Sequence, residues 1–232
     1  YHAAEGYISK LLKAGYKVAV CEQVEDPKTA KGVVKREVVE VITPGTVFNE
    51  SVLDDKQNNY LLAFSAVNDV FGISYVDLTT GEYLLTEVTS IEKLENEIER
   101  IAPSEILIEA DKEHLISNID RNFLITYSES FAFNMEYGLQ LLYNHFDVKT
   151  LEGFGLEKYT AGISAAAVLL EYIQENQKNN LEHITALKHY NTSEYMFIDE
   201  VTKRNLELIT SFWGEKKEGS LLSVIDATIT SM

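Results

Sequence analysis

Three short apolar runs in the middle of the sequence constrain the fold most. They cover residues 59–66, 70–77 and 81–88, and only short polar turns separate them, at Asn68-Asp69 and at Thr79-Thr80-Gly81. Strands joined by such short turns pair with their neighbours in an antiparallel meander. The middle of the chain is therefore predicted to contain three antiparallel strands.

Helices and strands alternate after this meander. A helix is predicted to begin at Ser90, a favourable N-cap residue, and to end before Pro103. The segments that follow are predicted as a strand at 106–108, a helix at 111–117, a strand at 123–127, and helices at 134–145 and 158–177. A meander followed by this alternation is the element order of a ribonuclease H-like α/β domain. A fold of this kind carries no activity by itself.

The residues on either side read as parts of further units. Before the meander, the pattern predicts a helix at 2–14, a buried strand at 18–21 and a β-branched strand that stops at Pro44-Gly45. Cys21, inside the apolar strand, is expected to be a small buried side chain. Near the other end, a helix is predicted at 200–210, and a helix or strand at 221–229.

Charge is distributed unevenly along the chain, whose formal net charge is −17. Residues 47–180 carry 8 Lys and Arg against 23 Asp and Glu, so this part should repel nucleic acid. Residues 1–46 carry 7 against 6, and Lys35 and Arg36 are candidates for contact with a DNA backbone. The alternative is that both belong to an ordinary solvated strand edge.

Known catalytic patterns are missing. A ribonuclease H-like nuclease needs carboxylates on its first strand, first helix and fourth strand, and the first strand here has none, which leaves only Asp77 and Glu109. Gly214 and Gly219 have the spacing of a phosphate-binding loop, but the lysine is absent. The five histidines show no metal-ligand spacing. No catalytic, cofactor-binding or metal-binding residue is therefore predicted.

The absence of two sequence features, an apolar membrane span and paired cysteines, indicates in which compartment the protein works. No apolar run approaches the roughly 18 residues of a membrane span, and the single cysteine cannot form an internal disulfide. A cytoplasmic protein with no membrane partner is expected. Because the sequence starts at Tyr1 without an initiator Met, we expect a piece of a longer protein.

A series of short motifs gives the most specific signal. Residues 18–46 contain, in order, Cys21-Glu22-Gln23, Asp26-Pro27, Ala30-Lys31-Gly32, Arg36-Glu37-Val38-Val39 and Thr43-Pro44-Gly45-Thr46. Three more motifs follow: Gly153-Phe154-Gly155, the run from Thr202 to Leu208, and Gly219-Ser220-Leu221-Leu222. Together they resemble the MutS family of DNA mismatch-recognition proteins over essentially the whole chain.

The resemblance implies an organisation and a function. Residues 1–46 would be the end of a mismatch-binding domain, 47–56 a linker, 57–180 a connector domain of ribonuclease H-like fold, and 181–232 the start of a helical core with lever helices. The longer protein would bind mismatched double-stranded DNA as a homodimer. Its ATPase site, with ATP and Mg²⁺, would lie beyond residue 232. The connector would relay conformational change between the two and dock a MutL-like partner.

The helix at 134–145 offers a candidate docking surface. At helical spacing, Leu139, Leu142, Tyr143 and Phe146 form one apolar stripe, and Tyr137, Gln140, Leu141 and Asn144 fall on the opposite side. The alternative is that Tyr137 and Leu141 pack under the loop at 147–157. A different class of function also stays open, namely a free-standing ribonuclease H-like scaffold or ligand-binding domain unrelated to mismatch repair.

Overall fold

The computed structural model describes residues 2–25, 32–47, 58–119, 122–129, 131–177, 181–194, 196, 198, 200–212 and 218–227. The chain divides into two compact units. One comprises Tyr1–Asp54 with Asn59–Tyr190, and the other Asp55–Asn58 with Asn191–Met232. None of the helices in the described ranges combines the length and the apolar character that a bilayer crossing needs.

The first unit is built on a mixed six-stranded sheet. Its meander consists of β3 (Tyr60–Val67), β4 (Val70–Asp77) and β5 (Glu82–Val88), paired antiparallel as predicted. The turn between β3 and β4 has positive φ at both Asn68 and Asp69, the backbone that matches the twist of a tight hairpin.

Three further strands extend the sheet in parallel. β6 (Glu105–Ile108) pairs with β3, β7 (Leu124–Tyr127) pairs with β6, and β8 (Lys188–His189) pairs with β5. The strand order is therefore β7-β6-β3-β4-β5-β8. β8 was not predicted, because two residues are too few to show a hydrophobic period.

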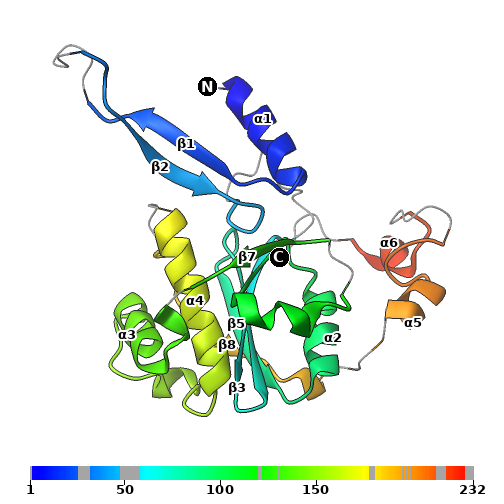
Figure 1. The fold of residues 1–232 in the computed structure, drawn as a ribbon. Coiled ribbons are helices and arrows are strands. Elements are labelled where there is room, and N and C mark those ends of the chain that lie inside the picture. The colour runs from blue at the N-terminus through cyan, green and yellow to red at the C-terminus, as the bar shows by residue number, and fades with distance from the viewer. Residues whose placement is uncertain are drawn as a thin grey trace. The chain divides into compact units, whose positions relative to one another are not determined.

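Helices cover both faces of this sheet (Figure 1). α3 (Met135–Phe146) and α4 (Thr160–Asn176) pack on one face, over a core that includes Leu61, Val76 and Leu85. α2 (Ile91–Ile101) and the 3₁₀ helix η1 (Ala110–Ile116) cover the other face. Strand residues alternate between the two cores. The predicted mixed α/β organisation is confirmed, and the helix expected at 111–117 is of the tighter 3₁₀ type.

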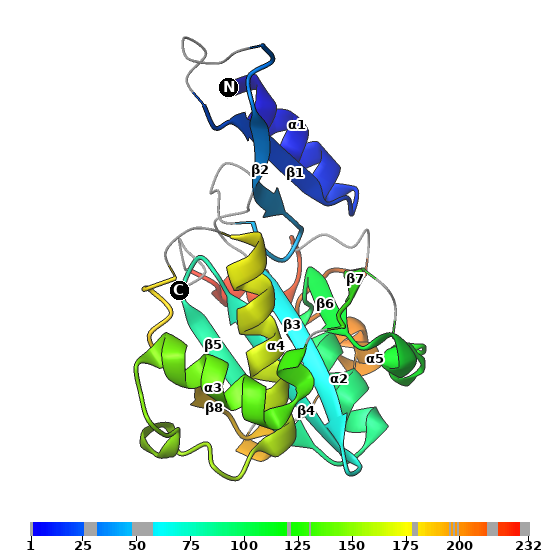
Figure 2. The same cartoon turned by 60° about the vertical axis from the view of Figure 1, so that its left-hand side comes forward.

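α4 lies very close to the strands beneath it (Figure 2). A Cβ atom on Gly72 of β4 would come within 2.0 Å of the backbone carbon of Ala161, so only glycine fits there. The Ser65 hydroxyl donates to the Ala161 carbonyl over 2.6 Å, and the Tyr83 hydroxyl donates to that of Ala166. Six of the seven residues at 161–167 are Ala, Gly or Ser, which permits this approach, and α4 is buried along most of its length.

Residues 2–47 add a helix and a hairpin to the first unit. α1 (His2–Lys13) precedes β1 (Val18–Gln23), which pairs antiparallel with β2 (Arg36–Ile42). The strand predicted at 18–21 is confirmed as part of β1, but its predicted burial is wrong, and Cys21 is exposed. The reason is that β1 and β2 form a two-stranded ribbon in the described part of the chain, so most of their side chains face solvent. Residues 26–31, which include the Asp26-Pro27 motif, and most of the predicted linker lie outside the described residues.

The remaining elements are short. The first unit also has the 3₁₀ helices η2 (Phe131–Phe133) and η3 (Glu152–Phe154). The second unit contains η4 (Thr192–Glu194), α5 (Glu200–Asn205) and α6 (Leu221–Ile225). The helix predicted at 200–210 ends early, and Glu207 just beyond it has a positive φ of 47°. Residues 181–190, by contrast, belong to the first unit, where Leu181, Ile184 and Leu187 join the core.

Candidate functional site

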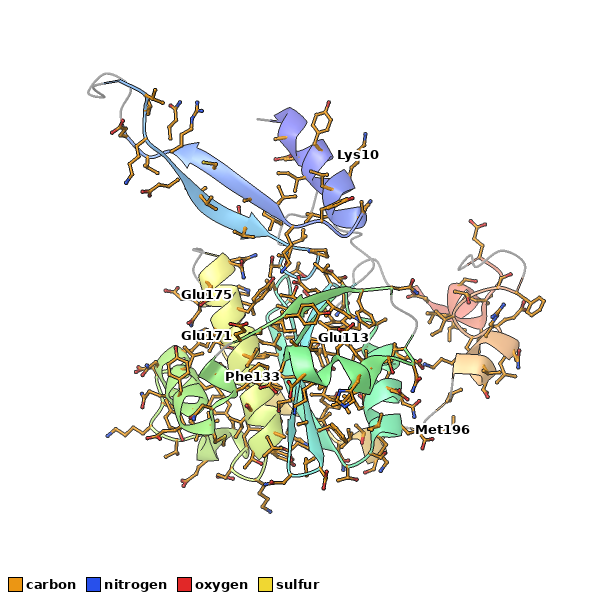
Figure 3. The ribbon with its side chains drawn as sticks, viewed as in Figure 1. Lys10, Glu113, Phe133, Glu171, Glu175 and Met196 are labelled. Atoms are coloured by element: carbon orange, nitrogen blue, oxygen red, sulfur yellow. The ribbon has the colours of Figure 1, made fainter. Side chains whose placement is uncertain are left out.

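The predicted docking surface on α3 is largely exposed. Tyr137, Gln140 and Asn144 face solvent, and Tyr137 is 47% exposed. The Tyr137 hydroxyl donates to Glu171 Oε1 of α4 over 2.9 Å, and this carboxylate raises the pKa of Tyr137. Gln140 Nε2 donates to Asn144 Oδ1, also over 2.9 Å. In Figure 3, Glu171 and Glu175 project from the same side of α4.

Leu141 does not belong with these three residues. It is half-buried and packs against the same core as Leu139 and Tyr143, so its predicted position on the solvent side is wrong. The cause is that α3 is covered on two sides, by α4 and by the segment at 181–185, and a helical projection that assumes one core misplaces residues between them.

Leu141 and Asn144 also line a cavity of about 790 Å³ near the C-terminal ends of α3 and α4. His145 contributes to this cavity, and its Nε2 lies 3.0 Å from the Ile184 carbonyl oxygen. The other lining residues are Phe146, Asp147, Gln174, Gln177, Leu181, Glu182, Ile184 and Thr185. The structure therefore places half of the predicted docking residues at a hollow and the other half on the open helix surface.

A second candidate feature is the turn that follows β2. Thr43 and Thr46 are fully buried, and their hydroxyl oxygens lie 2.9 Å apart. The side-chain amide of Gln177, the C-cap residue of α4, donates to the Thr46 carbonyl, and Asn59 Nδ2 donates to the Pro44 carbonyl over 2.9 Å. Hydrogen bonds from Gln177 and Asn59 thus attach the motif Thr43-Pro44-Gly45-Thr46 to the sheet domain.

Gly45 brings this turn against a buried carboxylate. A Cβ atom here would lie 2.7 Å from Leu61 Cδ1 and 2.8 Å from Glu105 Cβ, so no larger residue fits. The Gly45 N–H donates to Glu105 Oε2 over 3.1 Å. Glu105, the first residue of β6, is 0% exposed. It was not predicted as a site residue, although a carboxylate directly before the apolar run 106–108 is a usable signal of a buried charge.

Lys35 and Arg36, the candidates for DNA contact, are exposed where β2 begins. Lys35 Nζ lies 2.5 Å from Glu37 Oε1, and the Lys35 backbone N–H donates to Glu25 Oε1. A phosphate at Lys35 would therefore compete with a carboxylate for the ammonium group.

The structure also places Asp77 and Glu109, the two carboxylates considered above for a nuclease site. Asp77 is fully buried, and its Oδ1 accepts bonds from the N–H and the hydroxyl of Thr79, which closes the turn after β4. Burial is the main cause that raises the pKa of Glu109, with Asp111 as a further cause. Among the described residues, no group of three or more His, Cys, Asp or Glu could hold a metal ion.

The fold defines a class, namely a mixed α/β domain preceded by a helix and a hairpin. Comparison with known proteins identifies the family. Residues 59–185 match the model of MutS domain II, and residues 1–51 match that of MutS domain I. The chain therefore belongs to the MutS family.

Curated relatives match over the whole chain. Proteins named DNA mismatch repair protein MutS from Lachnoclostridium phytofermentans, Halothermothrix orenii and Protochlamydia amoebophila are 46%, 44% and 44% identical to it, each over 100% of this chain. The chain spans 25–28% of the length of these relatives. It is thus a fragment of a MutS-family protein.

Proposed function

We propose that this chain is mainly the connector of a protein that binds mismatched DNA as an ATP-controlled, homodimeric clamp. Residues 1–46 would be the end of its mismatch-binding domain, the sheet domain from about 57 to 190 the connector, and the residues from 191 onward the start of its core. ATP and Mg²⁺ would be bound by residues beyond 232, and a protein that acts on DNA in this way would work in the cytoplasm of a bacterium. The family matches support this reading.

We infer a ribonuclease H-like fold for the sheet domain. The support is its topology: a three-stranded antiparallel meander, with β6 added parallel to β3 and β7 parallel to β6. Because β3 carries no carboxylate, the ligand set of a ribonuclease H-like nuclease is incomplete here, and the role we propose for this domain is structural.

One observation carries the relay role, namely the buried turn at 43–46. Its bonds to Gln177, Asn59 and Glu105 connect the end of the hairpin to α4, to the start of β3 and to β6. Packed, hydrogen-bonded networks of this kind transmit small displacements between rigid elements. Movement of the mismatch-binding domain would therefore reach the connector through this turn.

The relay is tested by Gln177→Ala in the full-length protein. This change removes the α4 bond to the Thr46 carbonyl and should leave mismatch affinity without nucleotide unchanged, while ATP-driven release from the mismatch slows several-fold. Asn176→Ala is the matched control, because the Asn176 amide bonds only the Tyr172 carbonyl of its own helix among the hydrogen bonds described here. Unchanged release kinetics in Gln177→Ala would reject the relay.

Docking of a MutL-like partner is proposed for the exposed face of α3, at Tyr137, Gln140 and Asn144. An exposed aromatic ring beside two amides on an acidic domain suits a protein contact better than a nucleic-acid contact. Leu141 contributes through the adjacent cavity, but replacing it would also disturb the core.

The docking test is Tyr137→Ala combined with Gln140→Ala in the full-length protein. We expect recruitment of MutL to weaken about tenfold or more, as for loss of an interface hot spot, with mismatch binding unchanged. Tyr127→Ala is the control, since Tyr127 is similarly exposed (54%) and also donates to a carboxylate, Glu113 Oε2. Normal recruitment by a folded double variant would place the contact elsewhere.

A further inference from the structure

Glu105 is a buried carboxylate whose neighbours come from four separate segments. Its Oε1 accepts hydrogen bonds from the Thr126 hydroxyl of β7 over 2.5 Å and from the Tyr172 hydroxyl of α4 over 2.8 Å. Its Oε2 accepts from the Gly45 N–H over 3.1 Å. Lys17 Nζ, from the segment between α1 and β1, lies 3.8 Å from Oε1.

All four neighbours are present as donors or as a cation. Such a set suits the ionised carboxylate, which only accepts hydrogen bonds. A buried charge is costly unless it is paired and hydrogen-bonded. Moving any of these four neighbours away from Glu105 would therefore cost free energy.

Lys17 brings the cation to this site from the hairpin side. Its side chain is 40% exposed, and its Nζ lies 5.6 Å above the centre of the Tyr172 ring and 3.4 Å from the Tyr172 hydroxyl. Burial and the adjacent Glu105 raise the pKa of Tyr172, so its hydroxyl stays a proton donor. The cation, the ring and the carboxylate therefore form one compact cluster.

We propose that Glu105 is the positioning residue of the relay, and that its negative charge fixes both Lys17 and the turn at 43–46 on the sheet. The inference rests on the proposed connector function for its biological meaning, but its structural content can be tested without it. Lys17 precedes β1 and Gly45 follows β2, and Val18 pairs with Ile42, so one carboxylate anchors both strands at the open end of the hairpin.

The test is Glu105→Gln in the full chain, read by hydrogen exchange at the Gly45 amide. A glutamine keeps the shape but turns one acceptor into an N–H donor. The Thr126 and Tyr172 hydroxyls can rotate to accept from this N–H, and the remaining oxygen can still accept from the Gly45 N–H, but that oxygen no longer carries a charge and the Lys17 ammonium loses its anion. We expect Gly45 to exchange about tenfold faster, because a charge-assisted hydrogen bond becomes a neutral one and the Lys17 ion pair is lost, while the amides of β4 change little.

Glu97→Gln is the matched control. Glu97 is 8% exposed and is held by Arg100 and Tyr190 on the α2 side of the sheet, away from Gly45 and Lys17 in sequence and in its contacts. It reports what loss of a buried carboxylate does to the sheet in general. If Glu105→Gln accelerates Gly45 exchange no more than Glu97→Gln does, the proposal is overturned.

Lys17 supplies a second pair of variants that does not touch the core. Lys17→Met removes the ammonium and keeps the apolar stem, and should accelerate exchange at Gly45 and over 36–42. Lys17→Arg keeps the cation and should restore slow exchange. If Met and Arg behave alike, charge is not what holds the hairpin. The Gln177→Ala variant tests the relay separately, through the rate of ATP-driven release from the mismatch. The anchoring role of Glu105 and the relay can therefore be rejected independently of each other.

Discussion

His145 is a titratable side chain whose neutral form is favoured by the fold. Burial is the main cause that lowers its pKa below the usual 6.5, and the nearby His183 adds to this effect, while the bond to the Ile184 carbonyl acts in the opposite direction. Because the unfolded chain binds this proton more tightly than the folded one, unfolding is favoured as the pH falls through and below about 6.5.

We therefore expect the free energy of unfolding to decrease between about pH 7 and pH 5, and His145→Gln to reduce this dependence. Urea titrations at several pH values measure the free energy of unfolding of both chains. His114→Gln is the control, because His114 is exposed and bonds the Asp111 carbonyl within its own 3₁₀ turn. An identical pH profile in His145→Gln and the unchanged chain would contradict the prediction.

Single residues were the hardest level to predict from sequence. The motif at 43–46 was recognised from its residues, but its role as a buried turn depends on Gln177 and Glu105, which lie far away in the chain. Leu141 was misplaced because a helical projection cannot show that two different neighbours cover α3. These contacts are tertiary, and no local period encodes them.

At the scale of elements, the close approach of α4 to β4 is the most sensitive packing. Gly72→Ala would force a methyl group into the backbone of Ala161, and either α4 or β4 must shift. We expect a loss of about 1–3 kcal/mol in the free energy of unfolding, the usual cost of overpacking. Gly153→Ala is the control, since a Cβ atom there meets nothing within 4 Å and its φ is not in the left-handed region. Urea denaturation of both variants measures the free energy of unfolding, and equal values would refute the prediction.

Elements with a sustained period were predicted well. The meander, α2 and α4 follow from alternation, helical spacing and turn residues in the sequence. β8 and the early end of α5 could not be predicted in this way. β8 is only two residues long, and its place beside β5 is set by the sheet. Propensity decides little where an element is this short.

The charge of the whole chain leads to a prediction about DNA. With a net charge of −17, and Lys35 already beside Glu37, the isolated chain should bind duplex DNA poorly and without preference for a mismatch. A titration at about 50 mM salt, where phosphate contacts are strongest, measures this directly. Submicromolar affinity, or a preference for mismatched duplex, would show that the fragment reads DNA by itself.

The parallel pairing of β5 with β8 has a consequence for biosynthesis. The meander can form as soon as residues 60–88 have left the ribosome, but the outer edge of β5 gains its partner only when residues 188–189 follow. At about 5–20 residues per second, that edge stays open for several seconds or more. An open strand edge is a template for pairing with another chain. A nascent protein that stalls in this interval therefore exposes the edge of β5 to aggregation, and completion of the segment to residue 189 covers that edge at Leu84 and Leu85.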